Sequence, residues 1–486
     1  MPQKRKDSMI DIQIGSFKEA QILFLYKDAD HTSLPVQKMF RAEFLESFPL
    51  WQDSRLTLYI GLGKRGELSA RRMTDAVARG ARELRRLHQY EAEINLSAMV
   101  PVCGLDCIRS AVLGVKLGLY EYSPYRADSR EDSFRFFLHG IPQRLTETAE
   151  EYLEKAVHLA DSVVLARNLV NAPANRMTPS ILADTLRREA GKCGVQAEIL
   201  DEKESERLGM SAFLTVGSSS ANPPRLIVLR YLADPQSPLR TALVGKGVTC
   251  DTGGYCLKSK DSMLGIKGDM AGGAAVAGAI FALAQNQVKT NAVAVIPACE
   301  NRISRQSFLP GDVIQSMSGK TIEIQNTDAE GRLILADAVT YAIRAEGATR
   351  VLDIATLTGA VVGALGFTTA GVLTDSDQLW DDLSAAARVS GEQYWRLPIF
   401  PEYEEMVKSK IADVKNMGEH YCGTISAGLF IREFVEHLPW IHLDIAGTAW
   451  VDKPVFEHQS VGATGAGVTT LYDLLNTEGQ CSGQKI

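Results

Sequence analysis

Short apolar runs alternate with helical segments along almost the whole 486-residue chain. In the first third, the runs AQILFLY, LTLYIGL, EINLSAMV and FRFFLHG are typical of strands, and helical segments separate them, among them an arginine-rich one over residues 68–88. The second part repeats the alternation with the runs RLIVLRY, TALVGKGV, NAVAVIPAC, TIEIQN, RVLDIATL, AGVLT and IHLDIAG. This pattern predicts α/β domains, each with strands and helices packed in layers.

The length of the chain exceeds what one hydrophobic core usually supports, so two domains are expected. The stretch LTETAEEYLEKAVHLADSVVLARNLVN is amphipathic, begins with acidic residues and ends near the loop APANRMTPS. It predicts a long connecting helix. We therefore expect an N-terminal α/β domain over residues 1–144, a connecting helix over 145–170 and a larger catalytic domain over 171–486.

Composition excludes several classes of protein. The formal net charge of -7 gives no global attraction to nucleic acid or to an anionic membrane. The eight cysteines form no paired CxxC motifs, which favours a reduced, cytoplasmic setting over a disulfide scaffold or a structural zinc site. No secretory signal is apparent, and the apolar run from Met270 is too short to span a bilayer, so it predicts a buried helix and no membrane partner.

Two motifs resemble phosphate sites. GLGKRG (Gly61 to Gly66) matches GxGxxG, but the following strand does not end in the acid that would hold a ribose, so a strand-to-helix turn is the favoured interpretation over a dinucleotide site. GKT at Gly319 to Thr321 lacks the earlier glycine of a P-loop and precedes a strand, which again predicts a turn.

Three loops of the second part are dense in Asp, Glu, Lys and Gly. LVGKGVTCDTGGYCLKSK contributes Lys246, Asp251 and Lys258, and KGDMAGGAA contributes Asp269 before a helix rich in small residues. NTDAEGRLILADA places Asp328, Glu330 and Arg332 at every second position, so an extended backbone would direct all of them to one side. Because open α/β sheets bind ligands at the carboxyl ends of their strands, these loops are the expected place for chemistry.

Four carboxylates gathered at one edge would raise one another's pKa unless a cation offset them. A divalent metal is the economical solution. HExxH is absent and the histidines do not cluster near these loops, so a carboxylate-rich site with two metal ions is favoured over a zincin-type site.

Each residue also has a simpler interpretation. Asp269 alone would be a helix cap and Asp251 a residue of an Asx-turn. Lys246 would be a solvated strand end, and Glu330 with Arg332 a surface ion pair. The occurrence of all of them at the ends of candidate strands favours the metal site.

The motifs VGKGVTCDTGG, KGDMAGGAA, IPACEN, NTDAEGRLILADA, DIATLTGA and HLDIAGTAW resemble, in order and spacing, the M17 leucyl aminopeptidase (cytosol aminopeptidase) family. The likeness covers the chain from about Asn171 to Leu475, and NTDAEGRL is highly specific to that family. It implies a macro-like N-terminal α/β domain and a C-terminal α/β/α catalytic domain with a mixed, mostly parallel central sheet.

The resemblance further implies a metallo-exopeptidase with two divalent ions per subunit, manganese or zinc. Asp251 and Glu330 would bridge both ions, Lys246 and Asp269 would complete one site, and Asp328 the other. Lys258 would stabilise the oxyanion, and Arg332 would hold a bicarbonate that acts as general base.

The resemblance also implies a homohexamer and peptide substrates with a free N-terminus. It places the substrate at a small, apolar pocket suited to Leu-like side chains. The positions that would contact substrate are Ile266, Asn326, Thr356, Leu357, Gly359, Ala446 and Ala449.

Two alternatives stay open. The arginine-rich helix over 68–88 could add DNA binding to catalysis, although acidic residues interrupt it and favour a solvated or subunit-facing helix. A dipeptidase or Cys-Gly hydrolase of the same chemistry is the other alternative.

Overall fold

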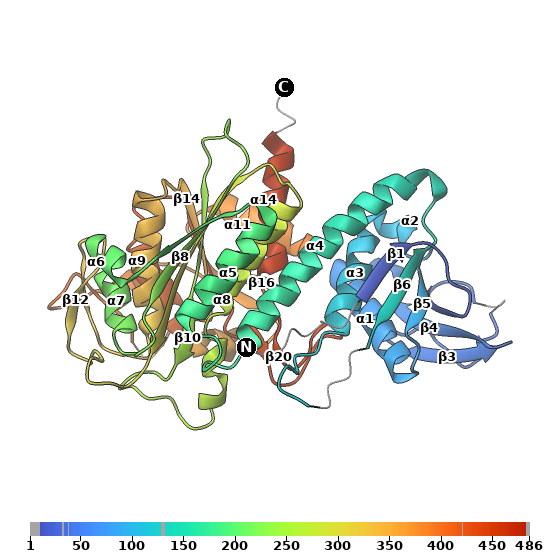
Figure 1. The fold of residues 1–486 in the computed structure, drawn as a ribbon, viewed down its shortest axis with the longest axis horizontal. Coiled ribbons are helices and arrows are strands. Elements are labelled where there is room, and N and C mark those ends of the chain that lie inside the picture. Colours follow the sequence, from blue (N-terminus) through green and yellow to red (C-terminus); the bar gives the residue numbers. More distant parts are fainter. Residues whose placement is uncertain (1–9, 32–33, 37, 128–131, 420, 483–486) are drawn as a thin grey trace. The chain divides into compact units, whose positions relative to one another are not determined.

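The computed structural model describes residues 10–31, 34–36, 38–127, 132–419 and 421–482 (Figure 1). Internal contacts divide the chain into two units, Met1–Val164 with Lys453–Val461, and Leu165–Asp452 with Gly462–Ile486. The division falls inside α4 (Thr146–Asn171), the helix in the segment that was predicted to connect the domains. No pattern in the sequence indicated that segment 453–461 belongs with the first unit.

The first unit contains a six-stranded sheet in the order β1-β6-β5-β2-β4-β3. All of its described strand pairs are parallel except β3 with β4. The strands are β1 (Ile10–Ile14), β2 (Ala20–Tyr26), β3 (Ser47–Gln52), β4 (Arg55–Gly63), β5 (Glu91–Asn95) and β6 (Phe134–His139). The helical elements are η1 (Arg65–Glu67), α1 (Ala70–Arg86), α2 (Val100–Cys103), α3 (Asp106–Gly118) and η2 (Gln143–Leu145).

Helices α1 and α3 pack closely because α3 presents glycine where they meet. A Cβ on Gly118 would lie 2.8 Å from the Cβ of Ala78. The arginine-rich helix predicted over 68–88 is α1, and its N-terminus is capped by Ser69, whose Oγ accepts a hydrogen bond from the Arg72 amide. GLGKRG forms the end of β4 and the turn into η1 and α1, as predicted for a strand-to-helix turn.

The second unit is built on a nine-stranded sheet in the order β16-β15-β18-β14-β9-β11-β8-β7, with β10 paired to β11. Its described pairs are mixed and mostly parallel, as predicted. The strands are β7 (Gln196–Leu200), β8 (Arg225–Leu232), β9 (Thr241–Gly245), β10 (Gly247–Asp251), β11 (Asn291–Asn301), β14 (Arg350–Ala355), β15 (Ala370–Leu373), β16 (Tyr394–Arg396) and β18 (Trp440–Asp444).

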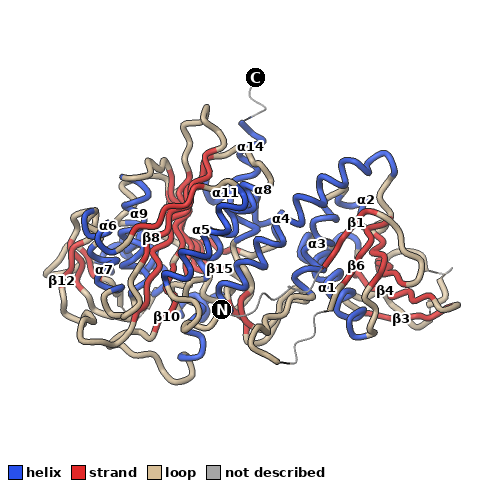
Figure 2. The backbone as a smooth tube through the Cα atoms, viewed as in Figure 1, coloured by secondary structure: helices blue, strands red, loops and turns tan. Residues whose placement is uncertain are grey.

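Helices cover both faces of this sheet (Figure 2). One group contains α5 (Pro179–Cys193), α8 (Ala271–Gln285), α11 (Asp377–Ser390) and α14 (Val468–Ser482), which contact one another in pairs. The other contains α7 (Ser211–Gly217), α9 (Glu330–Arg344) and α13 (Gly423–Arg432), and α7 and α13 both contact α9. The unit is therefore an α/β/α sandwich.

The remaining elements lie outside these layers. They are α6 (Glu202–Arg207), η3 (Met263–Gly268), α10 (Gly359–Leu365), α12 (Pro401–Glu404), η4 (Glu405–Val407), a small sheet of β12 (Val313–Gln315), β13 (Thr321–Glu323) and β17 (Val414–Lys415), and the pair β19 (Trp450–Val451) and β20 (Gly462–Ala463). The predicted strand TIEIQN is shorter than expected and belongs to the small sheet as β13. Gly319, in the GKT motif, adopts a φ of 95° in the turn between β12 and β13, as predicted.

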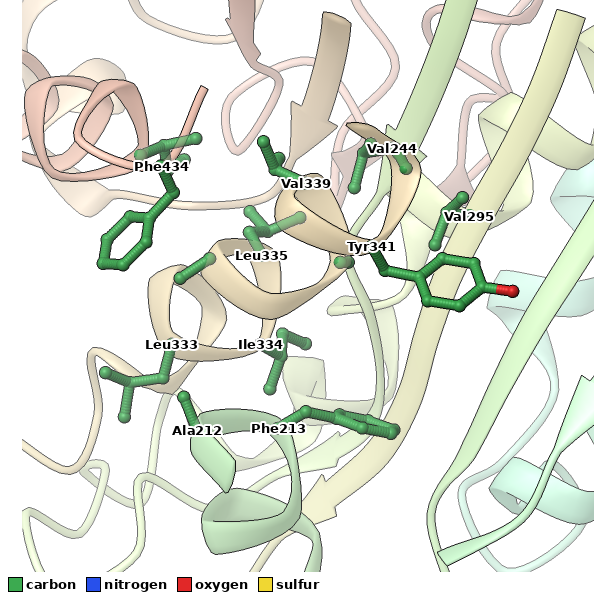
Figure 3. Close-up of a cluster of buried hydrophobic side chains, with 14 of the residues drawn as sticks. Ala212, Phe213, Val244, Val295, Leu333, Ile334, Leu335, Val339, Tyr341 and Phe434 are labelled. Carbon is green, nitrogen blue, oxygen red and sulfur yellow. The ribbon is translucent and has the colours of Figure 1, made fainter. Parts of the chain in front are cut away.

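A large cluster of buried apolar side chains fixes α9 to the sheet (Figure 3). Leu333, Ile334, Leu335 and Val339 of α9 pack among side chains of neighbouring elements. Those neighbours include Ala212 and Phe213 of α7, Val244 of β9, Val295 of β11, and Phe434. Because α9 is buried on all sides near its start, the loop that precedes it is held rigidly.

The apolar stretch Met263–Gln285 is long and hydrophobic enough to cross a membrane by composition alone. However, 83% of its most apolar window is buried inside the protein, and α8 contacts five strands of the large sheet. The stretch is a core helix, as predicted.

Candidate active site

Five charged residues converge at one edge of the large sheet, contributed by three separate segments. Lys246 lies between β9 and β10, Asp251 ends β10, and Asp269 follows η3. Asp328 lies in the turn before α9, and Glu330 is the first residue of that helix. Strands β9, β14 and β11 are parallel, so their carboxyl ends and the loops that follow them meet here, as predicted.

The carboxylates form a compact buried cluster. Ligand oxygens of Asp251, Asp328 and Glu330 all lie within 4.8 Å of one another. Glu330 is fully buried, and its Oε2 accepts no hydrogen bond from any described residue. A buried carboxylate oxygen without a donor is costly unless a cation completes the site.

Two lysines lie against this cluster. Lys246, only 3% exposed, places its Nζ 2.7 Å from Asp269 Oδ2 and 2.8 Å from Glu330 Oε1. Lys258 pairs with Asp251 at 2.7 Å and also with Asp328. Lys246 therefore balances buried negative charge, whereas the pair of Lys258 with Asp328 is partly exposed.

Burial dominates the electrostatics of the cluster. It raises the pKa of Asp251 to about 6, an effect that Glu330 reinforces and Lys258 and Lys246 oppose. Burial lowers the pKa of Lys246, but the carboxylates of Asp269, Glu330 and Asp251 outweigh burial and raise that pKa above its ordinary value. The charges of the site are thus strongly interdependent.

Small residues make room for this arrangement. A Cβ on Gly331 would lie 2.5 Å from Cε of Lys246, so the glycine of the EGR sequence is required for the lysine to pass. Gly253 adopts a φ of +85°, and a Cβ there would lie 2.7 Å from Asp328 Oδ1. Both glycines are explained by close packing around charged side chains.

The simpler interpretations fail for most of these residues. Asp269 is not a helix cap, because α8 follows Met270 without a side-chain cap, and Asp269 instead accepts a hydrogen bond from Thr356 Oγ1 at 2.8 Å. Lys246 and Glu330 are too buried to be a solvated strand end and a surface ion pair. Asp251 does accept a hydrogen bond from the Gly253 amide at 3.0 Å, as in an Asx-turn, and also one from Asn301.

The extended backbone expected through Asp328, Glu330 and Arg332 is wrong. The helix α9 begins at Glu330, so Glu330 and Arg332 both lie in its first turn. Residues two positions apart in a helix do not face each other, so Arg332 lines the cavity whereas Glu330 lies behind its wall against Lys246. The segment from Glu330 is helical and not extended because the buried apolar cluster stabilises α9.

Arg332 is buried beside the cavity with few partners. Its Nη1 donates to the carbonyl of Asn416 at 2.7 Å, and its Nε makes no hydrogen bond with a described residue. Burial lowers the pKa of Arg332 to about 10, although Glu330 and Asp444 oppose that shift. A buried guanidinium with unused donors is suited to hold an anion.

These residues line a cavity of about 500 Å³ within the second unit. The predicted site residues that line it are Lys246, Asp251, Lys258, Ile266, Asp269, Asn326, Asp328, Arg332, Thr356, Leu357, Gly359 and Ala446. Glu330 lies behind its wall, in contact with Lys246. Ala449 is buried and does not line it, although its neighbour Trp450 does.

The cavity also has lining residues that sequence reasoning missed. They are Ser262, Gly265, Gly268, Ala329, Thr358, Ala360, Met417, Glu419, Gly423, Ser426 and Trp450. Thr358, Ala360 and Trp450 adjoin predicted residues and could have been found that way. Met417 and Glu419 lie in the loop between β17 and α13, which has no local signal of a binding role.

The donor set fits divalent metal ions. Oxygen ligands of this kind suit hard or borderline cations such as manganese and zinc. Asp251, Asp328 and Glu330 form one close group, and buried oxygens of Asp269 and Glu330 accept no hydrogen bond from any described residue. The charges of Asp251, Glu330 and Asp269 all act on both Lys246 and Lys258. The residues present can therefore hold metal.

Comparison with known proteins agrees with this chemistry. The family model described as the cytosol aminopeptidase family, catalytic domain, matches residues 164–472, and the model for the N-terminal domain of that family matches residues 45–129. A probable cytosol aminopeptidase of Clostridium perfringens (strain 13 / Type A) is 44% identical over 86% of this chain and 86% of its own length. One from Treponema denticola is 40% identical over 89% of this chain and 91% of its own.

Solved structures of similar fold are enzymes of related description. The bottromycin maturation enzyme BotP, also solved in complex with Mn, matches with a TM-score of 0.87 and 31% identity over 95% of this chain and 99% of its own. A mutant of tomato leucine aminopeptidase matches with a TM-score of 0.87 and 30% identity over 98% of each chain. The chain belongs to the cytosol aminopeptidase family and is an M17 metallo-exopeptidase.

Proposed function

We propose that this aminopeptidase releases N-terminal Leu-like residues from peptides with two divalent ions, manganese or zinc. The observation that carries the proposal is the cluster of Asp251, Asp328 and Glu330, whose carboxylate oxygens lie within 4.8 Å of one another. The buried oxygens of Glu330 accept no hydrogen bond from any described residue. Lys246 and Asp269 would complete one ion site and Asp328 the other, with Asp251 and Glu330 shared. When bound, the ions would supply a Lewis acid and an activated water.

The chain's own residues set the register of cleavage. The acidic cluster would accept a free α-amine where it lines the cavity, so only the first residue of a peptide would be positioned. An acylated N-terminus cannot become an ammonium ion, and its amide nitrogen has no available lone pair, so it can neither pair with the carboxylates nor bind a cation that they hold. Exopeptidase action follows from this requirement for a free α-amine.

Lys258 and Arg332 would act on the reacting groups. The ammonium of Lys258 would donate a hydrogen bond to the scissile carbonyl oxygen as negative charge develops there. Arg332, with unused donors beside the cavity, would hold a bicarbonate as the general base. Asn326 lines the same cavity and would contact substrate.

The rest of the cavity supports a preference for apolar side chains. Ile266, Leu357, Gly359 and Ala446 form part of its wall, and few charged groups lie among them. Ala449 would affect substrate preference indirectly, through the position of its neighbour Trp450 in the cavity wall. This lining supports Leu-like substrates over charged ones.

The assembly and location of the enzyme are part of the same proposal. The homohexamer rests on the family resemblance of the motifs, and a cytoplasmic location is supported by relatives named cytosol aminopeptidases. Size-exclusion chromatography with light scattering tests the hexamer.

Metal removal and return tests the central claim. Chelation should abolish hydrolysis of leucyl amide, and recovery on adding Mn²⁺ or Zn²⁺ should saturate at two ions per chain. Asp269→Asn should weaken one of the two binding events. Saturation at a single ion, with full activity, would contradict the two-metal site.

A blocked substrate separates this function from the alternatives. N-acetyl leucyl amide should not be cleaved under conditions in which leucyl amide is cleaved rapidly. Equal cleavage of both would exclude the aminopeptidase mechanism. A strict preference for Cys-Gly over longer peptides would favour the dipeptidase alternative.

A further inference from the structure

Asp444 is a buried carboxylate at the edge of the substrate cavity that none of the proposed catalytic steps uses. It is the last residue of β18, pairs in register with Ala355 of β14, and is fully buried. It does not itself line the cavity. Its position places it directly behind the wall formed by the segments that follow β14 and β18.

The carboxylate binds both of those segments. Oδ1 accepts hydrogen bonds from the amides of Leu357 at 3.2 Å, Thr358 at 3.4 Å and Ala446 at 3.2 Å. Oδ2 accepts a bond of 2.6 Å from the hydroxyl of Thr358. Short bonds from a hydroxyl to a carboxylate are among the strong ones.

The bonded segments carry the pocket for the first side chain. Leu357, Thr358 and Ala446 line the cavity, and Gly359 and Ala360 follow at the start of α10. Thr358 also caps α10 by accepting a hydrogen bond from the Val361 amide at 3.2 Å.

The Thr358 hydroxyl also contacts α13, which forms a further part of the cavity wall. Thr358 Oγ1 lies 2.9 Å from Thr424 Oγ1 in α13, and the neighbouring Gly423 and Ser426 line the cavity. One carboxylate therefore joins the segments after β14 and β18 and, through Thr358, the start of α13.

We propose that Asp444 is a positioning residue that sets the shape of the pocket for the first side chain of the substrate and thereby its preference among apolar residues. The inference rests on the proposed aminopeptidase function. Removal of the carboxylate leaves three backbone amides and one hydroxyl without their acceptor, so the two segments can move apart.

The test compares Asp444→Ala with Asp444→Asn in the full-length protein loaded with manganese. Asn keeps an oxygen for the three amides, and its amide can donate to Thr358, whose hydroxyl then turns toward Thr424. We expect Asp444→Ala to lower the leucyl-to-alanyl amide ratio of kcat/KM about tenfold, mainly through KM. Asp444→Asn should retain a ratio close to that of wild type.

Asp337→Ala is the matched control. Asp337 is also fully buried and accepts two backbone amide bonds, from Phe213 at 2.9 Å and Met317 at 2.7 Å, but it does not line the cavity. Its replacement should lower the melting temperature as Asp444→Ala does, yet leave the ratio unchanged. Free leucine should protect Asp337→Ala, and not Asp444→Ala, against thermal unfolding.

An unchanged ratio in Asp444→Ala, or an equal change in Asp337→Ala, would overturn the inference. If Asp444→Ala does not fold, Thr358→Val against Thr358→Ser makes the same comparison, because only Ser keeps the bond to Asp444. A wild-type protein inactive on every free-amine amide would instead overturn the proposed function, and the inference with it.

Discussion

Lys246 and Lys258 show how much the role of one residue type depends on its surroundings. Both pair with two carboxylates and both line the cavity, but the side chain of Lys246 is only 4% exposed, whereas that of Lys258 is 22% exposed. Lys246 is therefore placed to belong to the wall of the metal site. Lys258 is placed to meet a substrate.

Replacing Lys258 by Met should therefore damage turnover more than binding. Loss of an oxyanion donor lowers kcat by roughly 10²–10³-fold, and KM for leucyl amide should change much less. Steady-state kinetics of leucyl amide hydrolysis measures both. Lys289→Met removes an exposed lysine that pairs only distantly with Asp234 at 3.7 Å, and it should leave both constants unchanged. A loss confined to KM would contradict the assigned role.

The buried carboxyl of Asp337, which lies outside the active site, should make the stability of the protein depend on pH. Burial raises its pKa from 3.8 to about 7, although backbone amides of Met317 and Phe213 oppose the shift. Because the folded-state pKa is the higher one, the folded protein holds this proton more tightly than the unfolded chain. The resulting stabilisation is complete below the unfolded pKa and is lost as pH rises through about 7.

Asp337→Asn cannot ionise, so its melting temperature relative to wild type should rise between about pH 4 and pH 7, the interval between the unfolded and folded pKa values. The pKa shift of Asp337 corresponds by linkage to a change of about 4 kcal/mol at most in the free energy of unfolding. Both proteins are melted in the same chelator so that metal binding does not contribute. The melting temperature of Asp377→Asn, which replaces an exposed acid, should change with pH in the same way as that of wild type. If the melting temperatures of Asp337→Asn and wild type change equally with pH, Asp337 does not titrate in this range.

At the scale of elements, the sequence predicted existence and type better than boundaries and partners. Apolar runs identified α8 and most strands of the large sheet, because these elements are buried on all sides. They did not identify β7 or β16. They could not show that α9 begins at Glu330, since that start depends on packing against α7 and the sheet. They also could not assign β13 to the small sheet, because strand pairing is not encoded in a single run.

The candidate site divides in the same way. The charged residues were predictable because Asp, Glu and Lys at strand ends need a chemical reason to be there. Met417, Glu419 and Asp444 were not, because their contribution comes from long-range approach of the loop before α13 and the end of β18. Their local sequence is compatible with ordinary loop and strand roles.

The start of α8 gives a prediction about the element that supports the site. A Cβ on Gly272 would lie 2.0 Å from the carbonyl oxygen of Ile354, and the next amide, of Gly273, donates to the carbonyl of Lys246 at 2.8 Å. Gly272→Ala should therefore push α8 away from β14, destabilise the protein by about 1–3 kcal/mol or more, and weaken metal binding by displacing Lys246. Thermal melting and manganese titration measure the two effects.

Gly191→Ala is the control for that substitution. Gly191 lies in α5, and a Cβ there would meet no atom within 4 Å. Helix propensity then predicts a gain of roughly 0.5–1 kcal/mol and unchanged metal binding. If Gly272→Ala binds manganese as wild type does, close packing of α8 is not what positions Lys246.

At the scale of the whole molecule, the net charge and the pairing of surface arginines bear on whether the protein binds nucleic acid. The chain carries a net charge of -7, and most arginines of α1 have partners within the first unit. Arg82 donates to the carbonyl of Gly118 at 2.9 Å and pairs with Glu457 at 3.3 Å. Arg79 pairs with Glu83 at 3.2 Å. Few cationic groups on this helix are free for phosphate.

We therefore expect no retardation of duplex DNA by the wild-type protein in a mobility-shift assay, even at low salt. The paired variant Glu83→Gln with Glu457→Gln removes the partners of Arg79 and Arg82 and makes the surface of α1 more basic. It should bind DNA weakly, with an affinity that falls steeply as salt increases, because phosphate contacts release counterions. Salt-sensitive binding by the wild type would show that the acidic partners yield to DNA, and the N-terminal unit would then have a second role beside catalysis. Equal absence of binding in both proteins would mean that intramolecular pairing is not what keeps α1 from DNA, and that the net negative charge of the chain suffices.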